Sequence, residues 1–179
     1  SISYISCNKK EDLANDKFII KNKFKNWQNT KIKSGEYLDS ISCNLDFFEN
    51  KKNKISLDSI SNIGFPEYSE IEYYFGDINN DKITDGIVTF NIKPCDGAWA
   101  LNNLQKKIII LSLKKSKYKI IENYFQPIAD SLGGGEIYID SISDNLILAV
   151  YYEHLDDDPN CCPSFKKHIK IDINSKITY

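Results

Sequence analysis

The sequence predicts an α+β fold that is mainly β, with an N-terminal helix followed by an antiparallel β-sheet meander. Eight runs rich in Ile, Tyr, Phe and Val follow one another along the chain, and turn residues separate them. The connections at 114–116 and 143–145 have the length of hairpin turns, which favours antiparallel pairing of the neighbouring runs. Helical spacing of apolar residues occurs within the polar, lysine-rich stretch 8–36, which precedes all eight runs.

The helix is predicted from four apolar side chains within residues 8–36. Phe18, Ile19, Phe24 and Trp27 are spaced so that they can share one side of a helix. Gly35 follows the last of them and is expected to end the helical region, because glycine adopts the left-handed conformation common after a helix.

The strands are predicted from β-branched and aromatic residues between turn signals. Three consecutive glycines at 133–135 lack the strand–loop–helix context of a phosphate-binding loop, so we interpret them as a flexible break. The predicted strands are 37–48, 70–76, 86–92, 106–113, 117–124, 136–142, 145–153 and 165–173.

Composition narrows the classes of function. The formal net charge is −2, and all 23 basic residues are lysine. Arginine's planar guanidinium is the usual group for gripping phosphates and guanine edges, so its absence argues against nucleic-acid readers and phosphoryl-transfer enzymes. An AT-rich genome would deplete arginine in the same way without functional meaning.

The first residues predict an export signal that has been processed. An apolar segment ends in Ser6, Cys7 follows, and the chain then becomes abruptly polar. This order resembles the lipobox of bacterial lipoproteins, in which the cysteine receives the lipid, and residues 8–12 resemble the sorting tether of Bacteroidetes surface lipoproteins. We therefore expect a lipobox remnant and tether at 1–10, a single domain at 11–179, and a protein anchored by lipid at Cys7 to the outer membrane, in the periplasm or at the cell surface. The alternative is a short first strand with a buried free cysteine.

The most specific motif is an acidic loop at residues 77–85. Oxygen-bearing side chains occupy relative positions 1, 3, 5 and 9, a spacing that lets them converge on a hard cation such as Ca²⁺. The candidate ligands are Asp77, Asn79, Asp81, the carbonyl of Ile83, and Asp85.

The loop departs from an EF-hand. Lys82 stands where glycine is usual, Val88 stands where a bidentate glutamate is usual, and the flanking residues predict strands. It resembles the strand–loop–strand calcium loops of FG-GAP-like modules, and the ion is expected to have a structural role. The missing glutamate predicts a weak affinity, of about 10⁻⁴–10⁻³ M. The alternative is a solvated acidic turn that binds no metal.

The second distinctive motif runs from Asp158 to Ser164 and reads Asp-Pro-x-Cys-Cys-Pro-Ser. Together with the acidic loop and the hairpins between them, it is similar to the LppP/LprE-type bacterial lipoproteins over residues 70–179. The resemblance implies export and a related fold but no particular activity.

The cysteines beyond Cys7 are expected to form disulfides, because an even number in an oxidising compartment favours pairing. Two alternatives remain open. Cys161 and Cys162 can close on each other through a strained ring, or Cys43 and Cys95 can bond to Cys161 and Cys162 in an undetermined order. A third alternative is a zinc site formed by Cys161 and Cys162 together with His154 and His168.

We expect the protein not to be an enzyme, since none of the common hydrolase motifs is present. Only two histidines exist: His168 is expected to be an ordinary sheet residue, and His154 has acidic neighbours that could orient it. The favoured function is a non-enzymatic binding or structural lipoprotein of the cell envelope, with a protein as its partner. The alternatives are a periplasmic inhibitor or immunity protein directed against a toxin or hydrolase, and an enzyme that uses His154. Nucleic acid is not expected as a partner, and the membrane is contacted through the lipid alone.

Overall fold

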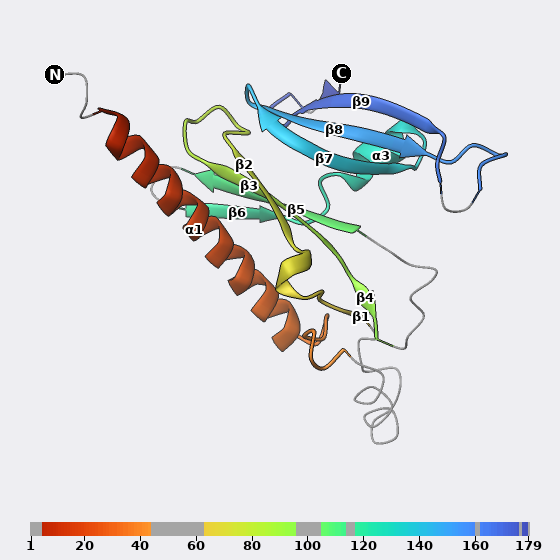
Figure 1. Ribbon diagram of the computed structural model, residues 1–179, viewed down its shortest axis with the longest axis horizontal. Coiled ribbons are helices and arrows are strands. Elements are labelled where there is room, and N and C mark those ends of the chain that lie inside the picture. Colours follow the sequence, from red (N-terminus) through yellow and green to blue (C-terminus); the bar gives the residue numbers. More distant parts are fainter. Residues whose placement is uncertain are drawn as a thin grey trace. The chain divides into compact units, whose positions relative to one another are not determined.

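The computed structural model in Figure 1 describes residues 5–43, 63–95, 105–113, 117–159, 162–175 and 177–178, with residues 5–12 described as backbone only. The chain forms two compact units. The first unit takes in Ser1–Ile20, Tyr74–Ile87 and Lys107–Tyr179, and the second takes in Lys21–Tyr73 and Val88–Lys106.

The predicted N-terminal helix is confirmed. Helix α1 spans Ile5–Lys33 and carries Lys31 and Lys33 in its last turn, where positive charge favours the helix dipole. Gly35 follows with φ +78°, and its N–H bonds the carbonyl of Ile32, so it ends the helix as predicted. Within the part of the chain that the structure describes, no helix is both long and apolar enough to cross a bilayer.

The buried face of α1 differs from the predicted one. Ile20 is fully buried and Phe24 is 1% exposed, whereas Phe18 is 64% exposed. Ile20 and Phe24 are four residues apart, so they project from the same side of the helix, and Phe18 does not.

Two four-stranded sheets account for most of the strands, as the predicted meander requires. One sheet has the order β2-β3-β5-β6 and the other β10-β9-β8-β7, so sheet neighbours follow chain order. A short antiparallel pair, β1 with β4, is separate from both. The strands are β1 Ile63–Gly64, β2 Glu72–Gly76, β3 Asp85–Asn91, β4 Lys93–Pro94, β5 Gln105–Leu113, β6 Lys117–Ile121, β7 Glu136–Ser143, β8 Leu146–Glu153, β9 Phe165–Asp172 and β10 Ile177–Thr178.

One predicted strand, 37–48, is wrong over its described part. Residues 37–43 form a turn with a single bridge from Leu38 to Gly64. The Asp39 carboxylate accepts the backbone N–H groups of Ile41 and Ser42, which closes a local turn and competes with strand pairing. Residues 44–48 lie outside the described residues.

Two short helices were not predicted. The 3₁₀ helix η2 spans Tyr68–Glu70, and α3 spans Gln126–Leu132 with a proline in its first turn. Gly133 follows α3 with φ +133°, so the first of the three glycines ends a helix.

The core of the first unit is lined by alternate residues of strands β7, β8 and β9. Their register places three rows of apolar side chains on one face of the sheet, and α3 contributes Ala129. The fully buried members include Ile147, Tyr151 and Ile171. This core gives the sheet one apolar face, and its opposite face carries the other alternate residues.

The core of the second unit is aromatic. Phe24, Trp27, Phe65 and Phe90 have ring centroids 5.5–5.9 Å apart, in tilted, stacked and edge-on pairs. Such pairs each add about 0.5–1.5 kcal/mol beyond the burial of their area.

Candidate functional site

The 77–85 loop connects strand β2 to strand β3 and contains two residues in the left-handed conformation. Asn80 has φ +61° and Lys82 has φ +68°. Asparagine tolerates this conformation well, but a lysine there costs about 1–2 kcal/mol, which glycine would avoid. The position where glycine is usual therefore keeps glycine's backbone conformation.

Three side chains of the loop turn their oxygens inward to the loop's own backbone. The Asp77 carboxylate accepts the N–H groups of Asp81 at 3.1 Å and Lys82 at 2.8 Å. The Asn79 side-chain oxygen accepts the Asp81 N–H at 3.0 Å, and the Asp81 carboxylate accepts the Ile83 N–H at 2.9 Å. These bonds wind the loop around its oxygen atoms.

Asp85, at the start of β3, is in a different environment from the other predicted ligands. It is fully buried, and one of its oxygens accepts both the backbone N–H and the hydroxyl of Ser112, at 2.7 and 2.6 Å. Its second oxygen accepts the Ile78 N–H at 2.8 Å. Burial raises the pKa of Asp85; the bonds to Ser112 and Ile78 lower it, and the nearby charge of Asp81 raises it further.

The loop is also tied to other parts of the first unit. The Asn79 amide donates to the Ser112 carbonyl at 3.3 Å, and the Asn174 amide donates to the Asn79 carbonyl at 3.2 Å. The loop is therefore held by contacts to β5 and to the turn that follows β9.

The donor set suits a hard cation in its chemistry. Asp77, Asn79 and Asp81 are half-buried, and each of their bonded oxygens keeps a second lone pair beyond the backbone N–H that it accepts. Asp85 has less capacity, because three donors already occupy its two oxygens. Within the described ranges, no three side chains of Asp, Glu, His or Cys form a group that could hold a metal ion. An ion in this loop would therefore take part of its coordination from amide and carbonyl oxygens and water.

The 154–164 loop connects β8 to β9 and is organised by one carboxylate. Asp158 accepts the backbone N–H groups of Leu155 at 2.8 Å and Ser164 at 2.7 Å. These bonds, with a minor contribution from the charge of His154, hold the pKa of Asp158 below its usual value. The carboxylate thereby joins the two ends of the loop.

The cysteine pairing excludes one of the predicted alternatives. Cys43 pairs with Cys95, with Cα atoms 4.7 Å apart. The alternative in which these two bond to Cys161 and Cys162 is therefore wrong. Cys162 is also disulfide-bonded, and Cys161 lies outside the described residues.

The Cys43–Cys95 disulfide closes a loop of 52 residues in sequence separation, a length for which about 4 kcal/mol of stabilisation is expected from chain entropy. Gly64 lies against it, since a Cβ at that position would come within 2.4 Å of the Cys43 side chain. The bridge and the β1–β4 pair therefore pack tightly together in the second unit.

The remaining predicted residues are not gathered into one site. Cys7 lies on α1, and its side chain is outside the described residues. His154 and His168 are exposed, the first in a loop and the second on β9. The possible zinc site of His154, His168, Cys161 and Cys162 is left without a thiolate at Cys162, because that sulfur is in a disulfide.

Comparison of the chain with protein-family models, with curated proteins and with solved structures gives no match. The similarity to the LppP/LprE-type lipoproteins therefore depends on the two motifs quoted above and stays a prediction.

Sequence reasoning missed the bonds between Asp85 and Ser112, which link residues 27 apart. A buried strand, 105–113, that contains a serine was the available signal, because a buried hydroxyl needs a partner. It also missed the outer face of β7–β9, where alternate residues of three predicted strands meet.

Proposed function

We propose that this chain is a non-enzymatic, exported lipoprotein domain with a binding role, whose 77–85 loop takes a calcium ion as a structural element. The calcium proposal rests on the orientation of the Asp77, Asn79 and Asp81 side-chain oxygens, which point into the loop. Two residues of the same loop have the left-handed backbone conformation. A calcium ion bound there would supply positive charge among Asp77, Asp81 and Asp85, and so reduce their mutual repulsion.

The expected affinity is low, in the range of about 10⁻⁴–10⁻³ M, because no bidentate glutamate follows the loop. Calcium at that concentration is found outside the cytosol, which agrees with the export predicted from residues 1–12. The Cys43–Cys95 disulfide also supports an oxidising compartment.

A thermal melt tests the calcium proposal. For a dissociation constant near 1 mM, 10 mM calcium is expected to stabilise the fold by about 1.4 kcal/mol relative to excess chelator. This corresponds to an increase in melting temperature of about 3–5 °C. Magnesium at the same concentration controls for ionic strength. Identical melting curves in calcium and in chelator would remove the ion from the proposal.

Two matched variants test whether the calcium ion binds in the 77–85 loop. Asp77→Asn is expected to abolish the calcium-dependent increase, because it removes one charged ligand. Asp144→Asn, at an exposed left-handed turn position between β7 and β8, is expected to leave the increase unchanged. Equal effects of the two variants would show that calcium acts elsewhere.

The anchor is tested separately. Mass spectrometry of the native protein from its own cell envelope is expected to find a lipid-modified Cys7 as the first residue. An unmodified Cys7 that retains upstream residues would contradict the lipoprotein assignment and leave the calcium result untouched.

A further inference from the structure

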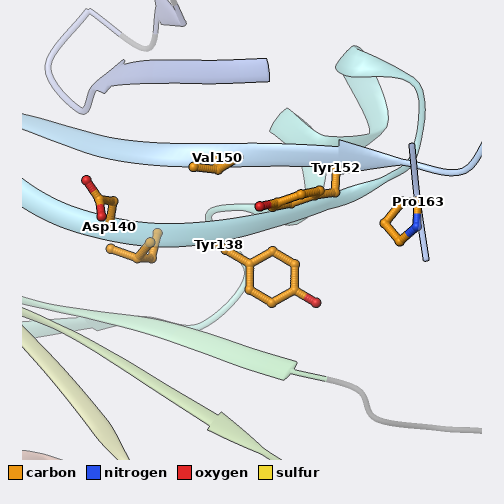
Figure 2. Close-up of a pocket in the computed structure, with 6 residues that line it drawn as sticks. Tyr138, Asp140, Val150, Tyr152 and Pro163 are labelled. Carbon is orange, nitrogen blue, oxygen red and sulfur yellow. The ribbon is translucent and has the colours of Figure 1, made fainter. Parts of the chain in front are cut away.

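The outer face of strands β7, β8 and β9 in the first unit carries a hollow with an aromatic lining (Figure 2). The hollow has a volume of about 440 Å³, and a second one of about 340 Å³ adjoins it through the shared residue Asp140. Figure 2 shows Tyr138 and Asp140 along β7, Val150 and Tyr152 along β8, and Pro163 beyond the end of β8.

The strand register explains why these residues share one face. Tyr138 pairs with Val150, which pairs with His168, and these three form one row across the sheet. The neighbouring row is formed by Glu136, Tyr152 and Lys166, and the row on the other side by Ser141, Leu148 and Lys170. Aromatic and aliphatic side chains thus occupy the middle of the face, and charged side chains border it.

Asp140 lies at a β-bulge in strand β7. The register of β7 on β8 shifts between Ile139 and Ser141, so Asp140 is the extra residue and faces no partner in the ladder. The shift also lets Ile139 and Ile142 both stay in the core although they are three residues apart. Asp140 is exposed and its side chain makes no hydrogen bond with the other described residues, so its carboxylate is available to a ligand.

The two tyrosine rings are held in place. Their centroids are 5.5 Å apart with the planes at 89°. The Tyr138 hydroxyl donates to Glu136 at 2.5 Å, and the Lys107 and Lys166 ammonium groups lie 5.7 and 5.6 Å from the Tyr138 and Tyr152 centroids. Rings fixed before binding lose little conformational entropy when a ligand stacks on them.

The end of the hollow is shaped by the second sequence motif. Pro163 lies between disulfide-bonded Cys162 and Ser164, whose N–H is held by Asp158. The ring of Pro163 is itself rigid. Residues 162–164 therefore form a wall at the tyrosine end of this face.

We propose that this face binds a neutral polysaccharide chain. The apolar C–H side of a sugar ring packs on a tyrosine, and each sugar hydroxyl both donates and accepts hydrogen bonds. The charged side chains around the two hollows meet both needs, because the carboxylates of Asp140 and Glu136 can accept hydrogen bonds, and the ammonium groups of Lys166 and Lys170 can donate them. The border carries carboxylates and ammonium groups together, so its charge selects neither a polyanion nor a polycation, and two adjoining open hollows suit a neutral chain that lies across the strands.

Affinity electrophoresis of the full chain tests this proposal, with xylan, laminarin, starch, dextran and mannan as neutral probes and polygalacturonate as the acidic one. At least one neutral polysaccharide is expected to retard the protein. Tyr138→Ala and Tyr152→Ala are each expected to weaken the apparent association at least tenfold, and Asp140→Asn at least threefold with an unchanged melting temperature.

Tyr68→Ala is the matched control, because Tyr68 is an equally large aromatic residue, 68% exposed and part of the second unit. It is expected to leave retardation unchanged. The proposal is overturned if no neutral polysaccharide retards the protein, or if Tyr138→Ala binds as well as the parent chain. Retardation by polygalacturonate alone, lost in 0.5 M NaCl, would also overturn it. None of these outcomes depends on whether the 77–85 loop binds calcium.

Discussion

Asp85 and Asp158 each close a loop of the first unit by accepting hydrogen bonds from backbone N–H groups, yet their pKa values are shifted in opposite directions. Asp85 accepts from Ile78 and Ser112 inside the protein, and burial raises its pKa. Asp158 accepts from Leu155 and Ser164 at the surface, and the same kind of bond lowers its pKa. Hydrogen bonds thus stabilise the charge of both carboxylates, but the pKa falls below its usual value only where the cost of removing water is small.

The largest expected effect is that of Asp85→Ala. The variant leaves the Ile78 N–H and the Ser112 N–H and hydroxyl without an acceptor in the core, where each loss costs about 1–3 kcal/mol, so we expect a loss of about 3–5 kcal/mol. Urea unfolding in chelator measures this change. Ser112→Ala, which removes one of the three donors, is the control and should cost about 1 kcal/mol. If Asp85→Ala lost less than the about 1 kcal/mol expected of Ser112→Ala, water would have replaced the carboxylate as the acceptor.

A smaller effect of opposite sign is expected for Lys82→Gly. Glycine adopts the left-handed backbone of this position without steric cost, although it loses more entropy on folding, so the net gain is about 0.5–1 kcal/mol. Asn80→Gly should change stability less, because asparagine already tolerates positive φ. Urea unfolding in chelator again provides the measurement, and destabilisation by Lys82→Gly would mean that its side chain contributes packing which outweighs the strain.

The smallest effect is expected at Asp158, and it depends on pH. Because the folded pKa lies below the unfolded value of about 3.9, the contribution of Asp158 is fully present above that value and is lost as the pH falls through the folded pKa. Asp158→Asn should therefore melt slightly below the parent at pH 7, by no more than about 2 °C, with the gap closing in strong acid.

Melting temperatures of both proteins between pH 7 and pH 2 measure that gap. Asp157→Asn is the matched control from the same loop and should melt at the temperature of the parent at pH 7. A gap that stays constant with pH would show that the lost stability does not come from the charge of Asp158.

The sequence carried enough information for the helix, the meander and seven of the eight predicted strands, because alternation and turn residues are local signals. Residues 37–43 were mistaken for a strand because their apolar residues suggest one, whereas the Asp39 side chain closes a turn instead. Helix α3 was missed because it has only seven residues, although Pro127 and Gly133 marked its two ends.

The site was predicted less completely, for reasons of distance along the chain. The spacing of Asp77, Asn79 and Asp81 showed that their oxygens can gather, but Ser112 as a partner of Asp85 depends on the packing of β5 beside β3. The pairing of Cys43 with Cys95 likewise depends on how distant segments approach each other. Such contacts depend on how distant segments pack in the folded chain, which local residue patterns do not specify.

The bulge at Asp140 has a consequence for how this sheet can change. A residue that is extra in the ladder contributes neither a cross-strand partner nor a core side chain, so the isoleucines on either side of it fix the strand without its help. Position 140 can therefore accept a different functional group while the strands around it stay as they are, and related chains could diversify what they recognise by exchanging a single amino acid there.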